Sequence, residues 1–138
     1  MQLVILSEAF YNDFPRAQCP EILEKENRPY YCLAVRVSGH IFAIPIRHHI
    51  RHKFAFFTIN DSGLDYTKAV VIDDPMYISS TSPWIDSMEW NILKGNENAI
   101  FYGFRKFLRQ YMRALKHPEN PRSTMFIKYT SLKYFDIS

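Results

Sequence analysis

The sequence predicts an α+β fold: a twisted, mainly antiparallel sheet shaped as a partly open barrel, with a C-terminal layer of helices. In the first half of the chain, short apolar runs alternate with period two and are separated by turn residues. In the second half the apolar period changes to 3.6 residues. The chain has 138 residues, of which 47% are hydrophobic, so residues 1–138 fit a single domain with its own core.

The first half of the chain is expected to form short strands. Residues 2–6 make the first strand, and Ser7 then caps a brief helix. Residues 30–37 alternate as a half-buried strand, and a tight turn at residues 38–40 returns the chain as strand 41–46, which completes a hairpin. Further strands are expected at residues 54–59, 69–72 and 76–78, with a turn at residues 60–63.

The second half is expected to be helical. Residues 85–93 form one helix, which Gly95 ends. A longer helix is expected at residues 97–116, because apolar residues repeat at helical spacing on one face. That stripe consists of Ile100, Phe104, Phe107, Leu108, Tyr111, Met112 and Leu115. The opposite face carries Arg105, Lys106, Arg109, Arg113 and Lys116. We expect the sheet to pack against the apolar stripe, with Trp84 and Trp90 anchoring the helical layer.

Charge and cysteine content set limits on partners and location. The net charge of +3 and the pI of about 8.9 permit a polyanionic partner without requiring one. Cys19 and Cys32 lack the paired spacing of a zinc site and are expected to be reduced thiols. No apolar run approaches the roughly 20 residues that cross a bilayer. We therefore expect a cytoplasmic protein with no membrane partner.

Residues 47–53 are the segment most suited to chemistry. They read Arg-His-His-Ile-Arg-His-Lys, so six of the seven side chains can carry a positive charge. A core does not accept so many charges, which places the segment in a loop or first helical turn at the sheet edge. Histidine transfers protons near neutral pH, and Arg and Lys hold phosphate. These groups suit attack of an RNA 2′-hydroxyl on the adjacent phosphodiester, which requires no metal ion or other cofactor.

Three other interpretations of the segment are open. The loop can be simply a solvated cationic surface, or it can belong to a non-catalytic RNA-binding module. His48 and His52 lie four residues apart and can face one zinc ion on a helix. The neighbouring cations disfavour that metal hydrolase, and the sequence offers no nearby carboxylate or thiol to complete the ligand shell.

A longer pattern resembles a known family. Residues 25–31 read Lys-Glu-Asn-Arg-Pro-Tyr-Tyr, residues 42–46 read Phe-Ala-Ile-Pro-Ile before the cationic loop, and residues 63–69 read Gly-Leu-Asp-Tyr-Thr-Lys-Ala. In order and spacing these segments resemble the ToxN/AbiQ family of type III toxin–antitoxin endoribonucleases, with the TenpN branch most alike. The likeness covers most of residues 22–80, and the helical remainder only in outline.

The resemblance implies both a fold and an activity. It implies a fold similar to the barrel of the Kid and MazF toxins. It implies RNA cleavage without metal that leaves a 2′,3′-cyclic phosphate, and inhibition by an antitoxin RNA whose tandem repeats fold as pseudoknots. It also implies assembly of toxin and antitoxin into RNA–protein hetero-oligomers. RNA, and not DNA, is therefore the expected partner.

The resemblance also implies roles for individual residues. The family carries Thr/Ser-Ser-Pro-Lys after the central strand, so His48 falls where the key serine would be, and Lys53 or Arg51 replaces the lysine. We expect His48 to act as base or acid. Further catalytic groups that bind or protonate the phosphate are expected at Arg47, His49, His52 and Lys53. Candidate RNA-binding residues are Lys25, Arg28, Tyr30, Arg51, Tyr66, Lys68, Arg105, Arg109 and Arg113. For Tyr30, Tyr66, Lys68 and the helix arginines, a core position or a solvated surface stays open.

Overall fold

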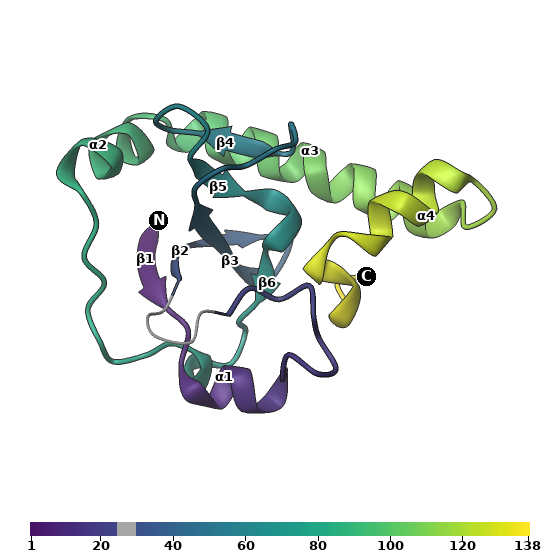
Figure 1. Cartoon of the computed structure of the whole chain (residues 1–138), viewed down its shortest axis with the longest axis horizontal. Helices are drawn as coiled ribbons and strands as arrows, with labels where there is room; N and C mark the ends of the chain where they lie inside the picture. The colour runs from purple at the N-terminus through teal and green to yellow at the C-terminus, as the bar shows by residue number, and fades with distance from the viewer. Residues whose placement is uncertain (25–29) are drawn as a thin grey trace.

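The computed structural model of the chain describes residues 1–24 and 30–138. Over these residues the chain forms an α+β fold with a six-stranded sheet (Figure 1). The strands are β1 (Gln2–Ile5), β2 (Tyr31–Val37), β3 (His40–Arg47), β4 (Ala55–Phe57), β5 (Gly63–Asp65) and β6 (Val70–Val71). The helices are α1 (Glu8–Asp13), α2 (Ser87–Gly95), α3 (Glu97–Lys116) and α4 (Pro121–Lys128), with 3-10 turns η1 (Tyr66–Lys68), η2 (Pro75–Tyr77) and η3 (Ser131–Tyr134). Among these residues every strand pairing is antiparallel and the sheet does not close on itself, which confirms the predicted α+β class.

The β2–β3 hairpin is the centre of the sheet. Ser38 and Gly39 connect the two strands, with φ angles of 53° and 83°. Positive φ at both turn positions matches the right-handed twist of the strands, and glycine adopts it without strain. The predicted hairpin is confirmed, but the turn is one residue shorter than expected. His40 belongs to β3, where it pairs with Val37.

β3 pairs with partners along both of its edges. One edge carries β2, and the other carries β6 near Phe42 and β5 near Arg47. β5 was not predicted, because Gly63 was assigned to a turn. A Cβ atom at Gly63 would overlap the carbonyl group of Phe56, so only glycine lets β4 and β5 approach this closely. The strand predicted at residues 54–59 is shorter than expected and is β4.

Two predicted features of the chain after β6 are wrong. Residues 76–78 were expected to form a strand, but Pro75–Tyr77 is the 3-10 turn η2, because the Asp74 side chain accepts a hydrogen bond from the Met76 amide. Trp84 was expected to anchor the helical layer, but its side chain is 75% exposed. Trp90, by contrast, packs against the main core.

Helix α3 has the predicted bounds and packs on the sheet through its apolar stripe. Phe104, Leu108 and Tyr111 are buried in one cluster with the β2 residues Leu33 and Val35. Leu115 is an exception, because it lies near the end of the helix beyond the sheet and is exposed. The predicted packing of the long helix against the hairpin is therefore confirmed.

A second, smaller core covers the other face of the sheet. Phe10 of α1 is fully buried there, together with Cys32 and Ala43 from the hairpin. Figure 1 shows α3 along one side of the sheet and α1 on the other. Both faces of the hairpin are thus occupied by core, which leaves the loops at the strand ends as the accessible parts of the sheet. In the part of the chain described, no helix is at once long and apolar enough to span a membrane.

Candidate active-site loop and cationic groove

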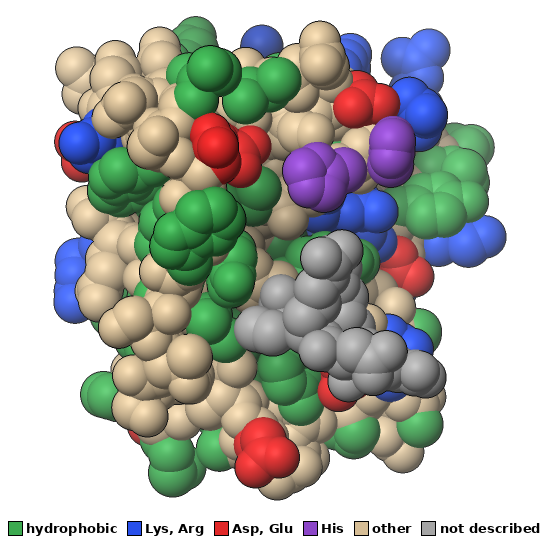
Figure 2. Space-filling model, turned by 60° about the vertical axis from the view of Figure 1, so that its left-hand side comes forward, with side chains coloured by type: hydrophobic (Ala, Val, Ile, Leu, Met, Phe, Trp, Pro, Cys, Tyr) green, Lys and Arg blue, Asp and Glu red, His purple; other side chains and the backbone are tan. Residues whose placement is uncertain are grey.

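The cationic segment is the loop that follows β3 at the sheet edge, as the sequence predicts. Ile50 holds the loop against the rest of the protein. Its side chain is buried, and its amide donates a hydrogen bond to the carbonyl of Asp61 over 2.9 Å. His49 adopts a φ of 58°, in the left-handed region that is uncommon for residues other than glycine. Figure 2 shows two histidine side chains beside each other on one face, with Lys or Arg and Asp or Glu side chains close by.

Asp65 holds the base of this loop from β5. Its side chain has no exposed surface and lies 2.6 Å from the guanidinium group of Arg47, measured Nη1 to Oδ2. Thr67 donates to the same carboxylate from its backbone amide and its hydroxyl group. Burial alone would raise the pKa of Asp65, but hydrogen bonds from His52, Thr67 and Arg47 outweigh it and hold the pKa below its ordinary value. Asp65 is therefore an ionised anchor for the cationic segment.

His52 is one of the groups that Asp65 holds. Its Nδ1 accepts a hydrogen bond from the Phe54 amide over 3.0 Å, so the proton lies on Nε2. Nε2 faces Asp65 Oδ1 at 3.1 Å. Both ring nitrogens are thus used within the protein. Arg47 and His52 are both held by Asp65 and stay about 30% exposed, so their binding or protonation of a phosphate stays a prediction.

His48 has a different partner. Its Nδ1 lies 2.7 Å from the hydroxyl oxygen of Ser62, which is almost fully buried. The strand register explains this pair: Arg47 is opposite Gly63, and one step further along the same antiparallel register brings His48 opposite Ser62. The hydrogen bond fixes the imidazole of the exposed His48 and leaves Nε2 as the ring atom available for proton transfer.

Ser62 was not singled out from the sequence. A serine in the segment Asn60-Asp61-Ser62-Gly63 is typical of a turn, and only the β3–β5 pairing makes it a neighbour of His48. The unpredicted strand β5 is therefore the reason that this residue was missed.

The other loop cations are more exposed. The side chains of His49 and Arg51 are 78% and 77% exposed, and both approach Oδ2 of Asp61, at 3.4 and 3.1 Å. Partial desolvation would raise the pKa of Asp61, but the hydrogen bond and charge of His49 and the charge of Arg51 lower it overall. Lys53 is exposed, with Nζ 5.6 Å from the centre of the Phe54 ring. Asp61 and Asp65 thus offset part of the positive charge, although the sequence indicated no carboxylate near the segment.

The zinc interpretation of the three histidines finds no ligand set here. His48 turns toward Ser62 and His52 toward Asp65, so the two rings do not converge. Among the residues that the structure describes, no three His, Cys, Asp or Glu side chains are arranged to hold a metal ion.

Two of the predicted RNA contacts are used inside the protein. Tyr66 is buried, and its hydroxyl group donates to the Ile100 carbonyl over 2.9 Å, in space left by the missing side chain of Gly103. Lys68 forms an ion pair with Glu21 at 2.7 Å and donates to the Tyr129 carbonyl. Tyr66 and Lys68 therefore both make contacts that stabilise the fold.

Other candidate RNA-binding residues lie in the sequence just before β2. Tyr30 is half-buried beside β2. Lys25 and Arg28 lie outside the residues that the structure describes.

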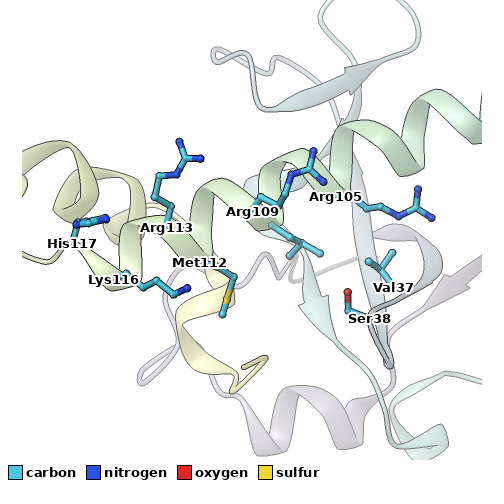
Figure 3. Close-up of a pocket in the computed structure, with 9 residues that line it drawn as sticks. Val37, Ser38, Arg105, Arg109, Met112, Arg113, Lys116 and His117 are labelled. Carbon is cyan, nitrogen blue, oxygen red and sulfur yellow. The ribbon is translucent and has the colours of Figure 1, made fainter.

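The basic face of α3 lines a separate hollow of about 550 Å³. Figure 3 shows Arg105, Arg109, Arg113 and Lys116 following one another along the helix, with Val37 and Ser38 approaching from the β2–β3 hairpin. Apolar side chains of Leu108 and Met112 also line it. Across the described part of the chain, none of these four cations has a carboxylate within ion-pair distance. We name this hollow the cationic groove, and its charge suits an extended polyanion.

No protein-family model, curated protein or solved structure matches the chain. The resemblance to the ToxN/AbiQ family thus stays a prediction from sequence.

Proposed function

We propose that the chain is a metal-independent endoribonuclease toxin of the type III class, with His48 as the group that moves protons at the scissile phosphodiester. The observation that carries this proposal is the pair formed by His48 and Ser62 at the sheet edge, 2.7 Å apart. A histidine oriented through one nitrogen by a buried hydroxyl group has its second nitrogen in a fixed direction, which general acid–base catalysis requires.

The chemistry proposed at the loop is an internal transfer. His48 Nε2 takes the proton of an RNA 2′-hydroxyl, and the 2′-oxygen then forms a bond to the adjacent phosphorus. The bond from phosphorus to the 5′-oxygen breaks, and that oxygen leaves with a proton. The products are a 2′,3′-cyclic phosphate and a 5′-hydroxyl end.

Neighbouring side chains supply the other two functions of this reaction. The ring centroid of the exposed His49 lies 6.5 Å from that of His48, so His49 is suited to protonating the leaving oxygen of the same phosphodiester. Lys53 and Arg51 are the exposed cations that would stabilise charge on the phosphate.

The proposal extends to the partners that the family resemblance implies. The cationic groove would follow the phosphates of a repeat-derived pseudoknot antitoxin RNA, and toxin and RNA would assemble into hetero-oligomers in the cytoplasm. Four cations line one groove and have no carboxylate partner among residues 1–24 and 30–138, which supports binding of such a polyanion. A relation to the Kid and MazF barrels is part of the same proposal, and its support is limited to an antiparallel sheet covered by helices.

The decisive experiment is cleavage of end-labelled RNA by purified protein in excess chelator. We expect cleavage with cyclic-phosphate ends, and a loss of about 10²–10⁴-fold in the single-turnover rate of His48→Ala. The pH–rate profile of the native protein should contain a limb in the titration range of histidine that the variant lacks. His40→Ala is the matched control, because His40 begins the strand that ends just before His48, and it should cleave normally.

Two alternative functions give different results in this experiment. A non-catalytic RNA-binding module, which the cationic groove also favours, would bind the RNA without cutting it. A metal-dependent hydrolase would lose its activity on chelation. Near-normal cleavage by His48→Ala would contradict the proposed role of His48.

A further inference from the structure

An apolar groove lies next to the candidate loop, and we name it the aromatic groove. It has a volume of about 590 Å³ and runs between the end of the loop and α4. Its lining consists of His52, Phe54, Phe107, Pro121, Arg122, Met125, Phe126 and Tyr129. Phe54 and Phe107 both contact the Phe126 ring, with ring centroids 5.3 and 5.2 Å apart. Met125 and Tyr129 are each 51% exposed, an unusual exposure for large apolar side chains in neighbouring turns of one segment.

A smaller polar hollow adjoins the aromatic groove. Its volume is about 300 Å³, and it shares Phe54 and Phe107 with the aromatic groove. Lys53 and Lys106 contribute the positive charge of the polar hollow, and Arg122 contributes that of the aromatic groove. In the described ranges, 1–24 and 30–138, neither lining includes an Asp or Glu, and these three cations form no ion pair.

The apolar lining of the aromatic groove and the cations beside it together indicate which kind of ligand fits there. A nucleotide unit has a flat base with apolar faces and an anionic phosphate on each side. Aromatic side chains stack with bases of any sequence, and Lys and Arg neutralise the phosphates beside them. A purely apolar peptide or a second apolar protein surface would offer no negative charge to the three cations, Lys53, Lys106 and Arg122, beside the groove.

We propose that the aromatic groove binds one base of single-stranded RNA, with Lys53 and Lys106 holding the phosphate next to it. This inference rests on the proposed function and deepens it. His52 lines the groove and also contacts Asp65, which holds Arg47 immediately before His48. The proposed nucleotide thus lies on the same side of the loop as the contacts that hold Arg47 and His52. Base preference at that position is set by Tyr129, Met125 and Arg122.

The test measures binding with a probe that cannot be cleaved. Fluorescence anisotropy of a labelled 2′-O-methyl hexanucleotide gives affinities for the native protein and for Tyr129→Leu, which keeps apolar volume but removes the ring. We expect Tyr129→Leu to weaken binding about 5- to 150-fold, the range for loss of one stacked base. Trp84→Leu is the matched control: it removes an even more exposed aromatic ring, which does not line the groove, and should bind normally.

Two further measurements test whether the lysines contact the RNA phosphates and whether the base lies in the aromatic groove. Lys53→Ala with Lys106→Ala should reduce the slope of log affinity against log salt by about 1.4, or about 0.7 for each contact with a single strand. A hexanucleotide with 5-iodouracil should crosslink on irradiation to the tryptic peptides 123–128 or 129–133. Crosslinks confined to other peptides would overturn the proposal.

These outcomes separate the groove from the catalytic proposal. Because the probe is not cleaved, its affinity is measured independently of any proton transfer by His48. Equal affinities of Tyr129→Leu and the native protein would overturn the groove inference and leave the cleavage result untouched. If Tyr129→Leu instead converts a dimer into a monomer in sedimentation without changing oligonucleotide affinity, the groove is a contact between copies of this chain and the inference is wrong.

Discussion

Asp65 shows how one side chain can organise a cationic loop. A carboxylate without exposed surface needs partners that neutralise it, and the structure supplies Arg47, His52 and Thr67. In turn, the carboxylate fixes three groups that would otherwise repel one another or move freely. Four residues thus become part of the framework, and they leave His48, His49, Arg51 and Lys53 as the exposed side chains of the loop.

Replacing Asp65 should reveal this role as a loss of stability. We expect Asp65→Asn to lower the free energy of unfolding by about 3 kcal/mol at pH 7, because it leaves partly buried cations without their counter-charge. Urea unfolding followed by circular dichroism measures the change. Glu119→Gln, on an exposed carboxylate, is the control and should change stability by less than about 0.5 kcal/mol.

The same substitution has a pH dependence of known sign. The pKa of Asp65 is lower in the folded chain than its ordinary value of 3.8, so the unfolded chain takes up the proton more readily. The carboxylate therefore stabilises the fold above about pH 4 and loses this contribution as the pH falls further. The stability difference between native protein and Asp65→Asn should shrink between pH 5 and pH 2. A constant difference over that range would contradict the assignment.

Ser62 should act on cleavage through the orientation of His48. We expect Ser62→Ala to lower kcat about tenfold with little change in KM, because the imidazole loses its fixed direction while the RNA-binding surfaces stay intact. Ser62→Thr retains the hydroxyl group and should restore most of the rate. A Ser62→Ala variant whose KM rises while kcat is unchanged would show that the hydroxyl group serves RNA binding instead.

At the scale of single residues, the sequence predicted the location of the site better than its internal contacts. The cationic loop was evident because six of seven consecutive side chains can carry a positive charge. The partners of His48, Arg47 and His52 lie 13 to 18 positions away, and they become neighbours only through the pairing of β3 with β5. Local patterns do not contain that pairing.

The short strand β5 positions the site although it has only three residues. Gly63 lets it approach β4, and the register that follows brings Ser62 and Asp65 to the loop. The sequence did not indicate β5, since a strand of this length that begins at glycine looks like a turn. The hairpin and α3 were predicted correctly because each has a long periodic pattern of its own.

Gly63 should therefore tolerate no side chain. We expect Gly63→Ala to destabilise the fold by about 1–3 kcal/mol, because the added methyl group overlaps the Phe56 backbone and forces the strands apart. Gly95→Ala is the matched control, since a Cβ atom there meets nothing within 4 Å and lies in a helix. Thermal unfolding should give a lower midpoint for the first variant and an equal or higher one for the second.

Helix α3 divides its surface between the core and the cationic groove. If the groove follows RNA phosphates, replacing Arg105, Arg109 and Arg113 by Glu should weaken binding of the antitoxin RNA and lower its salt slope by about two to three. If the chain is the proposed toxin, growth arrest by the protein without antitoxin RNA should persist, because the loop is unchanged. Three reversals elsewhere on the surface, at Arg36, Lys94 and Lys133, control for total charge. Unchanged affinity after the α3 reversals would assign this helix face to solvent alone.

At the scale of the whole molecule, the smaller core encloses two reactive groups that the proposed chemistry does not use. Cys19 and Cys32 are free thiols in the smaller core, and burial raises the pKa of Cys32 to about 12. Since the thiolate is the reactive form, neither cysteine should react with a disulfide reagent while the chain is folded.

The rate of thiol labelling should therefore depend on how often the whole chain unfolds. We expect labelling by Ellman's reagent to be slow in native buffer and complete within the mixing time in denaturant. A Thr81→Cys variant, with a thiol on an exposed loop, should gain one rapidly reacting group. Two rapid equivalents in the unmodified protein under native conditions would show that the smaller core opens by itself.

The distance in sequence between the hairpin and its covering helix has a consequence for synthesis. The hairpin is complete at Arg47, whereas the helix that buries its larger apolar face begins at Glu97. At about 5–20 residues per second, a ribosome needs several seconds to make the intervening segment. Throughout that interval the nascent chain displays Leu33, Val35 and Phe42 to its surroundings, so a holding chaperone has a defined target and a defined time in which to act.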